Sequence, residues 1–136
     1  MVAVWCVSDV DVDNNTPDAQ KSKNIQLNEY TKMANEHGFK IALSNPCFEL
    51  WFLLHFEYTA GYIDDYDAVE KKLLAHLPNY KKNGDIFGII VDRQASAIDY
   101  AKKLKRYHEV ELERTDLYNV SVNPYTNVWE LVESLT

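Results

Sequence analysis

The chain has 136 residues, of which 46% are hydrophobic and 26% charged, a balance typical of one globular domain rather than a disordered segment or a fibre. Acidic side chains outnumber basic ones by 21 to 14, and the net charge of −7 argues against binding nucleic acid through a uniform basic coat. The longest apolar run, residues 48–56, is too short to span a bilayer, so we expect no membrane segment. Cys6 and Cys47 lack the spacing of a zinc site, and we expect two free thiols in a reducing, cytoplasmic setting.

The first third of the chain has the pattern of a strand, a helix and a second strand. Residues 2–7 form an apolar, β-branched run that predicts a central strand covered on both faces. Residues 19–37 carry a partial helical stripe, and Gly38 fits the C-cap of that helix. Residues 39–43 predict the second strand. Short turns between these elements are typical of a βαβ unit, which predicts parallel pairing.

Two further helices are predicted in the middle of the chain. Residues 46–56 are apolar on nearly all sides, and Asn45 and Pro46 suit the N-cap and the first position of a helix. Such a helix is expected to be surrounded by the rest of the protein. Residues 64–77 predict an amphipathic helix.

The last third is predicted to be mainly helical. Residues 89–108 form a long amphipathic stretch, whose first residues, 89–91, fit either a strand or the start of a helix. Residues 123–135 predict a loop followed by a short helix, with Asn127 at the N-cap and Glu130 three residues later.

The most pointed chemical feature is the group of three carboxylates after the first strand, Asp9, Asp11 and Asp13. Ligands bind at the carboxyl ends of parallel strands, and clustered carboxylates repel one another unless they share a cation. Oxygen ligands alone suit Mg²⁺ or Mn²⁺, which commonly acts on phosphates. An acidic, solvated turn and an aspartyl phosphotransferase remain alternatives, whereas an EF-hand is excluded because Asn14 and Gln20 occupy its glycine and glutamate positions.

Three other features permit either a structural or a functional interpretation. Glu49 lies in the apolar helix, where a carboxylate needs an exposed edge, a cationic partner or a role in an active site. His55 is the histidine we would test, because it falls in the same helix. The basic run at residues 102–106 predicts either a solvated helix face or a contact with a nucleic-acid backbone.

Three segments together resemble the RloB family, also known as AbiLii-type abortive-infection proteins. They are VWCVSDVDVD, SNPCFELWFLLHFE and NPYTNVWELVE, and the resemblance covers essentially the whole chain. It implies a Toprim-like α/β domain: a partial parallel sheet flanked by helices, with a helix-rich C-terminal half. We therefore expect a single domain over residues 1–136, with a βαβ core at 1–44 and a mainly helical part at 45–136.

The resemblance also assigns residues. Asp9 and Asp11 would be the metal-binding DxD pair of the Toprim domain. Two family motifs would contain Ser44, Asn45, Pro46 and Glu49, and Asn123, Pro124 and Asn127. Family members are expected to carry a further N-terminal portion with the Toprim glutamate in a CEGE-like motif, while this sequence starts at the DxD strand. We therefore expect the chain to be a fragment, a truncated gene product or a split domain that a partner completes. Trp129 stands where the family is expected to have histidine more often.

Two functional hypotheses follow from the resemblance. The first is a Mg²⁺- or Mn²⁺-dependent, Toprim-like nuclease acting on nucleic acid in bacterial defence against phage, with Asp9, Asp11 and Glu49 as catalytic candidates and Asp13 assisting the metal. The second is a non-catalytic interaction module that forms a homo-oligomer or pairs with a partner, because a first strand without neighbours exposes an edge.

Overall fold

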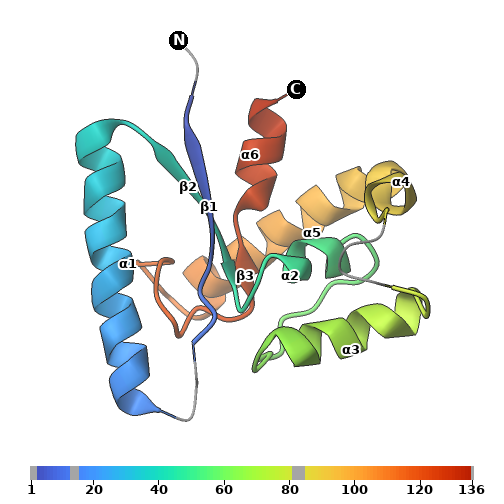
Figure 1. Ribbon diagram of the computed structural model, residues 1–136, viewed down its shortest axis with the longest axis horizontal. Helices are drawn as coiled ribbons and strands as arrows, with labels where there is room; N and C mark the ends of the chain where they lie inside the picture. Colours follow the sequence, from blue (N-terminus) through green and yellow to red (C-terminus); the bar gives the residue numbers. More distant parts are fainter. Residues whose placement is uncertain (1–2, 13–15, 81–84, 136) are drawn as a thin grey trace.

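The computed structural model describes residues 3–12, 16–80 and 85–135 (Figure 1). Its elements follow one another as β1 (Trp5–Asp9), α1 (Pro17–His37), β2 (Lys40–Asn45), α2 (Glu49–Leu53), α3 (Tyr66–His76), α4 (Phe87–Ile90), a 3₁₀ turn η1 (Val91–Arg93), α5 (Gln94–Arg106), a π-helical turn η2 (Tyr107–Glu111), β3 (Tyr125–Thr126) and α6 (Val128–Ser134). The chain is thus a mixed α/β protein, as the sequence predicts.

The predicted βαβ unit is present. β1 and β2 pair in parallel, from Trp5 opposite Lys40 to Asp9 opposite Ser44, and the short β3 pairs antiparallel with the end of β2. The connecting helix α1 ends as predicted at Gly38, whose positive φ of 73° is the left-handed conformation of a C-cap. The Gly38 N–H donates a 2.9 Å hydrogen bond to the Ala34 carbonyl.

Helices cover both faces of the sheet. On one face Ile41 and Leu43 of β2 pack in a cluster with Leu27 and Ala34 of α1. On the other face Ala42 packs with residues of α2, α5 and α6, which contribute Trp51, Leu54, Ala97, Ala101 and Val128. Figure 1 shows the same arrangement, with α1 on one side of the strands and α5 and α6 on the other. The alternation along β2 therefore places this strand inside a three-layer core.

The apolar helix α2 is surrounded by protein, as its composition predicts. Trp51 and Leu54 pack toward the sheet, while Leu50 and Leu53 belong to a third cluster with α3. The helix is shorter than predicted, since it begins at Glu49 rather than at residue 46. The prediction for α3 is confirmed, and its N-cap Asp65 accepts a 2.9 Å hydrogen bond from the Ala68 N–H.

The prediction that the first strand is central is wrong for the part of the chain that the structure describes. The strand order is β1-β2-β3, so β1 lies at an edge, and Val4 and Val7 are 59% and 53% exposed. The apolar composition of residues 2–7 matches a covered strand, but here it leaves apolar side chains in solvent.

The predicted cap at Asn45 is also wrong. Asn45 is the last residue of β2, the Asn45–Pro46 peptide bond is cis, and the residue preceding α2 is Phe48. The Asn45 side chain donates to the carbonyls of Val120 and Val122 at 3.1 and 2.9 Å instead of accepting from a helix N-terminus.

In the C-terminal half, the open question over residues 89–91 is settled in favour of helix, because Ile89 and Ile90 end α4 and Val91 opens η1. The predicted helix over residues 89–108 is therefore broken at the 3₁₀ turn before α5. Across the ranges that the structure describes, none of the helices has the length and hydropathy needed to cross a membrane.

Candidate functional site

The carboxyl ends of β1 and β2 bring two of the sequence motifs together. The Val10 N–H donates to the Ser44 carbonyl at 2.9 Å, and the Asp11 N–H donates to the Pro46 carbonyl at the same distance. The DxD segment therefore lies directly beside the Ser44–Pro46 segment, at the carboxyl ends of the strands, where parallel α/β proteins bind ligands.

Asp9 has a structural contact at this edge. Its Oδ1 accepts a 3.0 Å hydrogen bond from the N–H of Phe48, the residue that precedes α2. The contact ties the end of β1 to the start of α2 and fixes the orientation of the carboxylate. A carboxylate with two oxygens accepts several bonds, so this contact is compatible with binding a cation.

Asp11 has an unusual backbone conformation. Its φ is 36°, in the left-handed region that non-glycine residues seldom occupy, although aspartate tolerates it better than most. The loop is held on either side because Val10 is fully buried and Val12 packs against the α1 cluster. The Asp11 side chain itself is exposed, at the surface of a firmly anchored turn.

Glu49 is the first residue of α2 and is only 5% exposed. The pKa of the Cys47 thiol is raised to about 12, first by burial and then by the negative charges of Glu49 and Asp9. Both carboxylates are therefore near one thiol. The charge of Glu49 also raises the pKa of Tyr80, after burial as the larger cause.

The predicted metal ligands are Asp9, Asp11 and Asp13. Within residues 3–12, 16–80 and 85–135, no set of three or more His, Cys, Asp or Glu side chains is arranged to hold a metal ion. Asp13 lies outside the described residues, so the three-aspartate group stays a prediction. Mg²⁺ is commonly held by one or two carboxylates plus water and substrate phosphates, and the pair Asp9 and Asp11 fits that chemistry.

Asp9 also lines a cavity of about 280 Å³ between β1 and α1. Lys23 of α1 also lines this cavity, and so do Ser8 of β1 and Tyr30 of α1, whose hydroxyl groups share a 3.2 Å hydrogen bond. A carboxylate and an ammonium group thus share one opening beside the DxD turn.

The motif asparagines Asn45 and Asn123 form a buried hydrogen-bond network. The Asn123 side chain donates to the Ile63 carbonyl at 2.7 Å and accepts from the Ile63 N–H at 2.9 Å. It also donates to Asn45 Oδ1 at 3.3 Å. These contacts join β2 to the loops before α3 and before β3, so both asparagines satisfy backbone groups that would otherwise be buried without partners.

The remaining motif residues lie around β3. Ser44 Oγ and Thr126 Oγ1 share a 2.8 Å hydrogen bond, and both residues are fully buried. Asn127 precedes α6 as predicted, but its side chain makes no cap: Oδ1 accepts from the Leu43 N–H at 2.6 Å and Nδ2 donates to the Ile41 carbonyl at 2.9 Å. The family-motif residues Ser44, Asn45, Asn123 and Asn127 thus form a buried hydrogen-bonded joint next to the carboxylates.

Sequence reasoning missed His108. It is 1% exposed, its Nε2–H donates to the Pro124 carbonyl at 2.7 Å, and burial lowers its pKa. A signal was present, since His108 continues the buried stripe of Ala97, Ala101 and Leu104 at helical spacing. His55 is also buried and its Nδ1–H donates to the Trp51 carbonyl, so neither histidine lies at the carboxylates' surface.

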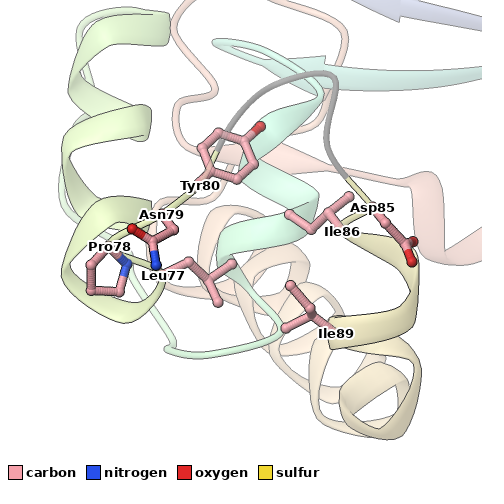
Figure 2. A pocket seen from close by; sticks show the side chains of 7 residues that line it. All are labelled: Leu77, Pro78, Asn79, Tyr80, Asp85, Ile86 and Ile89. Atoms are coloured by element: carbon pink, nitrogen blue, oxygen red, sulfur yellow. The ribbon is translucent and has the colours of Figure 1, made fainter.

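A separate cavity of about 300 Å³ lies between the end of α3 and α4. Figure 2 shows apolar side chains converging on it: Leu77 from just after α3, Ile86 from just before α4, and Ile89 from α4. None of the residues that line it belongs to the predicted site.

The fold and the site define an α/β protein with carboxylates and an asparagine-rich joint at the carboxyl ends of its parallel strands. The family model described as RloB-like protein matches residues 2–135, and the chain belongs to this RloB-like family. No curated protein and no solved structure matches the chain.

Proposed function

We propose that this protein is a Toprim-like nuclease, which uses Mg²⁺ or Mn²⁺ for phosphoryl transfer on nucleic acid during bacterial defence against phage. The proposal includes a cytoplasmic location, which suits the two free cysteines.

One observation carries the proposal: the DxD turn and the start of α2 meet at the carboxyl end of the parallel strand pair. The backbone contacts of Val10 and Asp11 with the Ser44–Pro46 segment, and the Asp9 contact with Phe48, hold the carboxylates there. The carboxyl ends of the strands are where α/β proteins bind ligands, with several loops contributing contacts.

In this proposal Asp9 and Asp11 hold the cation and Asp13 assists. The cation supplies electrostatic stabilisation of the phosphate that reacts. Lys23, which lines the same cavity as Asp9, offsets phosphate charge. Glu49 is the candidate for proton transfer, because it is the other carboxylate whose charge acts on the Cys47 thiol together with that of Asp9.

The test is the melting temperature with and without MgCl₂ or MnCl₂, combined with cleavage of labelled single- and double-stranded oligonucleotides. At about ten times the Kd, a bound cation stabilises the fold by about 1.4 kcal/mol, or roughly 3–6 °C for a chain of this size. Asp9→Asn and Asp11→Asn are expected to remove both the shift and cleavage. Asp9→Asn retains an oxygen that accepts from the Phe48 N–H, so the fold is preserved.

Asp92→Asn is the matched control, because Asp92 is an exposed carboxylate on η1 away from the strand ends. It is expected to keep the full shift. Identical melting curves with and without either metal, or an equal loss in Asp92→Asn, would contradict the metal site. Cleavage that persists in EDTA would contradict the mechanism.

A second candidate function rests on a separate observation. β1 is an edge strand with Val4 and Val7 more than half exposed, a surface that suits self-association or a partner strand. The chain would then act as an interaction module of a defence protein, without catalysis.

A further inference from the structure

The end of α5 carries the densest group of cations in this acidic chain, at residues 102–106. Its members face two directions. Lys102 lies 3.3 Å from a Glu133 carboxylate oxygen and, like Lys105, lies over the Trp129 ring, so this pair is directed toward α6. Lys103 and Arg106 are exposed and line a different surface.

That surface is a cavity of about 570 Å³, which we call the α5 cavity, lined by Tyr58, Ala60, Lys103, Arg106, Tyr107, Val110 and Glu111. Its volume is within the range of small-molecule sites. The Lys103 ammonium group lies 4.3 Å from the centre of the Tyr58 ring, which holds the cation beside the opening. No ion pair involves Lys103 or Arg106 in the ranges that the structure describes.

The wall of the α5 cavity includes a rare backbone element. Tyr107, Val110 and Glu111 belong to the π-helical turn η2, in which the Leu112 N–H donates to the Tyr107 carbonyl at 3.1 Å. The turn continues α5 and ends the helical segment at Glu111. The turn places an aromatic ring, Tyr107, and an apolar side chain, Val110, on the same surface as the cations.

The combination of cations and aromatic rings fits single-stranded nucleic acid better than a duplex. A duplex is held by an extended basic surface, which a chain of net charge −7 lacks. A single strand needs only a local positive groove for the phosphates and rings on which bases stack. Glu111 opposes the cations within the α5 cavity, so we expect binding to be weak and dependent on salt.

We propose that the α5 cavity binds a short stretch of single-stranded nucleic acid, with Lys103 and Arg106 on the phosphates and Tyr107 stacked on a base. The inference rests on the proposed function for the class of partner, and it adds a binding site separate from the carboxylates.

The test is the fluorescence anisotropy of labelled oligothymidine and oligouridine with the full chain, in EDTA and at low salt. The double variant Lys103→Ala/Arg106→Ala is expected to bind about ten-fold more weakly, and losing two phosphate contacts lowers the salt slope by about 1.4. Tyr107→Leu is expected to weaken binding at an unchanged salt slope. The control is Lys71→Ala/Lys72→Ala on α3, which removes the same charge from another exposed surface.

The control double variant is expected to bind within about twofold of the unmodified chain, because it keeps the α5 cavity. Three results would overturn the inference: no binding by the unmodified chain, no loss in Lys103→Ala/Arg106→Ala, or equal loss in the α3 control. Because binding is measured without metal, Asp9→Asn and Asp11→Asn are expected to bind normally. The metal-dependent melting shift, which tests the proposed function, should in turn be unchanged in Lys103→Ala/Arg106→Ala.

Discussion

Asn127 shows how one buried side chain substitutes for a missing stretch of strand. β3 pairs with only the last two residues of β2, Ser44 and Asn45. Just beyond it, the Asn127 amide accepts from the Leu43 N–H and donates to the Ile41 carbonyl, as a backbone residue of a longer β3 would. The ladder is thus continued by a side chain while the main chain turns into α6.

Asn127→Ala is therefore expected to lower the free energy of unfolding by about 2–4 kcal/mol, because it leaves two buried backbone groups without partners. Urea denaturation measures this loss. Asn28→Ala, at an exposed position of α1, is the control and is expected to change stability by less than about 0.5 kcal/mol. A similar effect in both variants would show that Asn127 has no special role in the joint.

His108 makes stability depend on pH. Burial holds its pKa below the ordinary value of 6.5, and the charge of Arg114 lowers it further, against the hydrogen bond to Pro124. Above about pH 6.5 the imidazole is neutral in both folded and unfolded chains, whereas below it only the unfolded chain takes up the proton. Stability is therefore expected to fall as the pH drops from about 6.5 toward the folded pKa.

The measurement compares urea midpoints at about pH 7.5 and pH 5.5. His108→Gln is expected to show a smaller loss than the unmodified chain, since glutamine keeps a donor for the Pro124 carbonyl and does not titrate in this range. The remaining loss comes in part from His55, whose pKa is also lowered by burial. His37→Gln, at the exposed end of α1, serves as the control. If His108→Gln and His37→Gln change the pH dependence equally, the assignment is wrong.

At the scale of elements, the helices that local patterns predict are confirmed, whereas a pattern that fits two kinds of structure leads to a wrong prediction. The apolar stripes of α1 and α3 predict both helices within a few residues of their bounds, and the predicted C-cap Gly38 is present. The dipeptide Asn45–Pro46 fits both the start of a helix and the end of a strand. Here the Asn45 side chain contacts the carbonyls of Val120 and Val122, which are 75 and 77 residues away, and these contacts belong to the end of a strand. Sequence patterns carry no record of such distant partners.

The end of α1 gives a prediction for an element boundary. Gly38→Ala is expected to lower stability by about 1 kcal/mol, because a side chain is disfavoured at its φ of 73° although nothing lies within 4 Å of the added Cβ. Gly61→Ala is the matched control, since its Cβ also meets nothing within 4 Å and its φ lies outside the left-handed range. Thermal denaturation compares the two, and equal melting temperatures would contradict the backbone explanation.

For the whole molecule, the sequence is enough to predict the α/β class and the parallel strand pair. Those follow from periodicity and from the geometry of βαβ units. It was not enough to show that the motif asparagines bridge backbone groups, or that Asp9 accepts from Phe48, because these contacts depend on the packed positions of distant segments. The prediction that β1 is central is wrong for the same reason. The apolar composition of a strand indicates that its faces are covered, but not whether a neighbouring strand pairs with it on each side.

The exposed edge of β1 leads to a prediction about assembly, which also tests the alternative function. An edge strand with apolar side chains in solvent is a template for pairing with a second chain, and Val7 is 53% exposed there. We expect the average mass from light scattering to rise with protein concentration, and Val7→Lys to suppress the rise because charged edge residues block strand pairing. Ile25→Lys on α1 is the control, with the same 53% exposure and the same added charge. A constant monomer mass for the unmodified chain, or equal suppression by both lysines, would remove the edge as an association surface and with it the support for an interaction module.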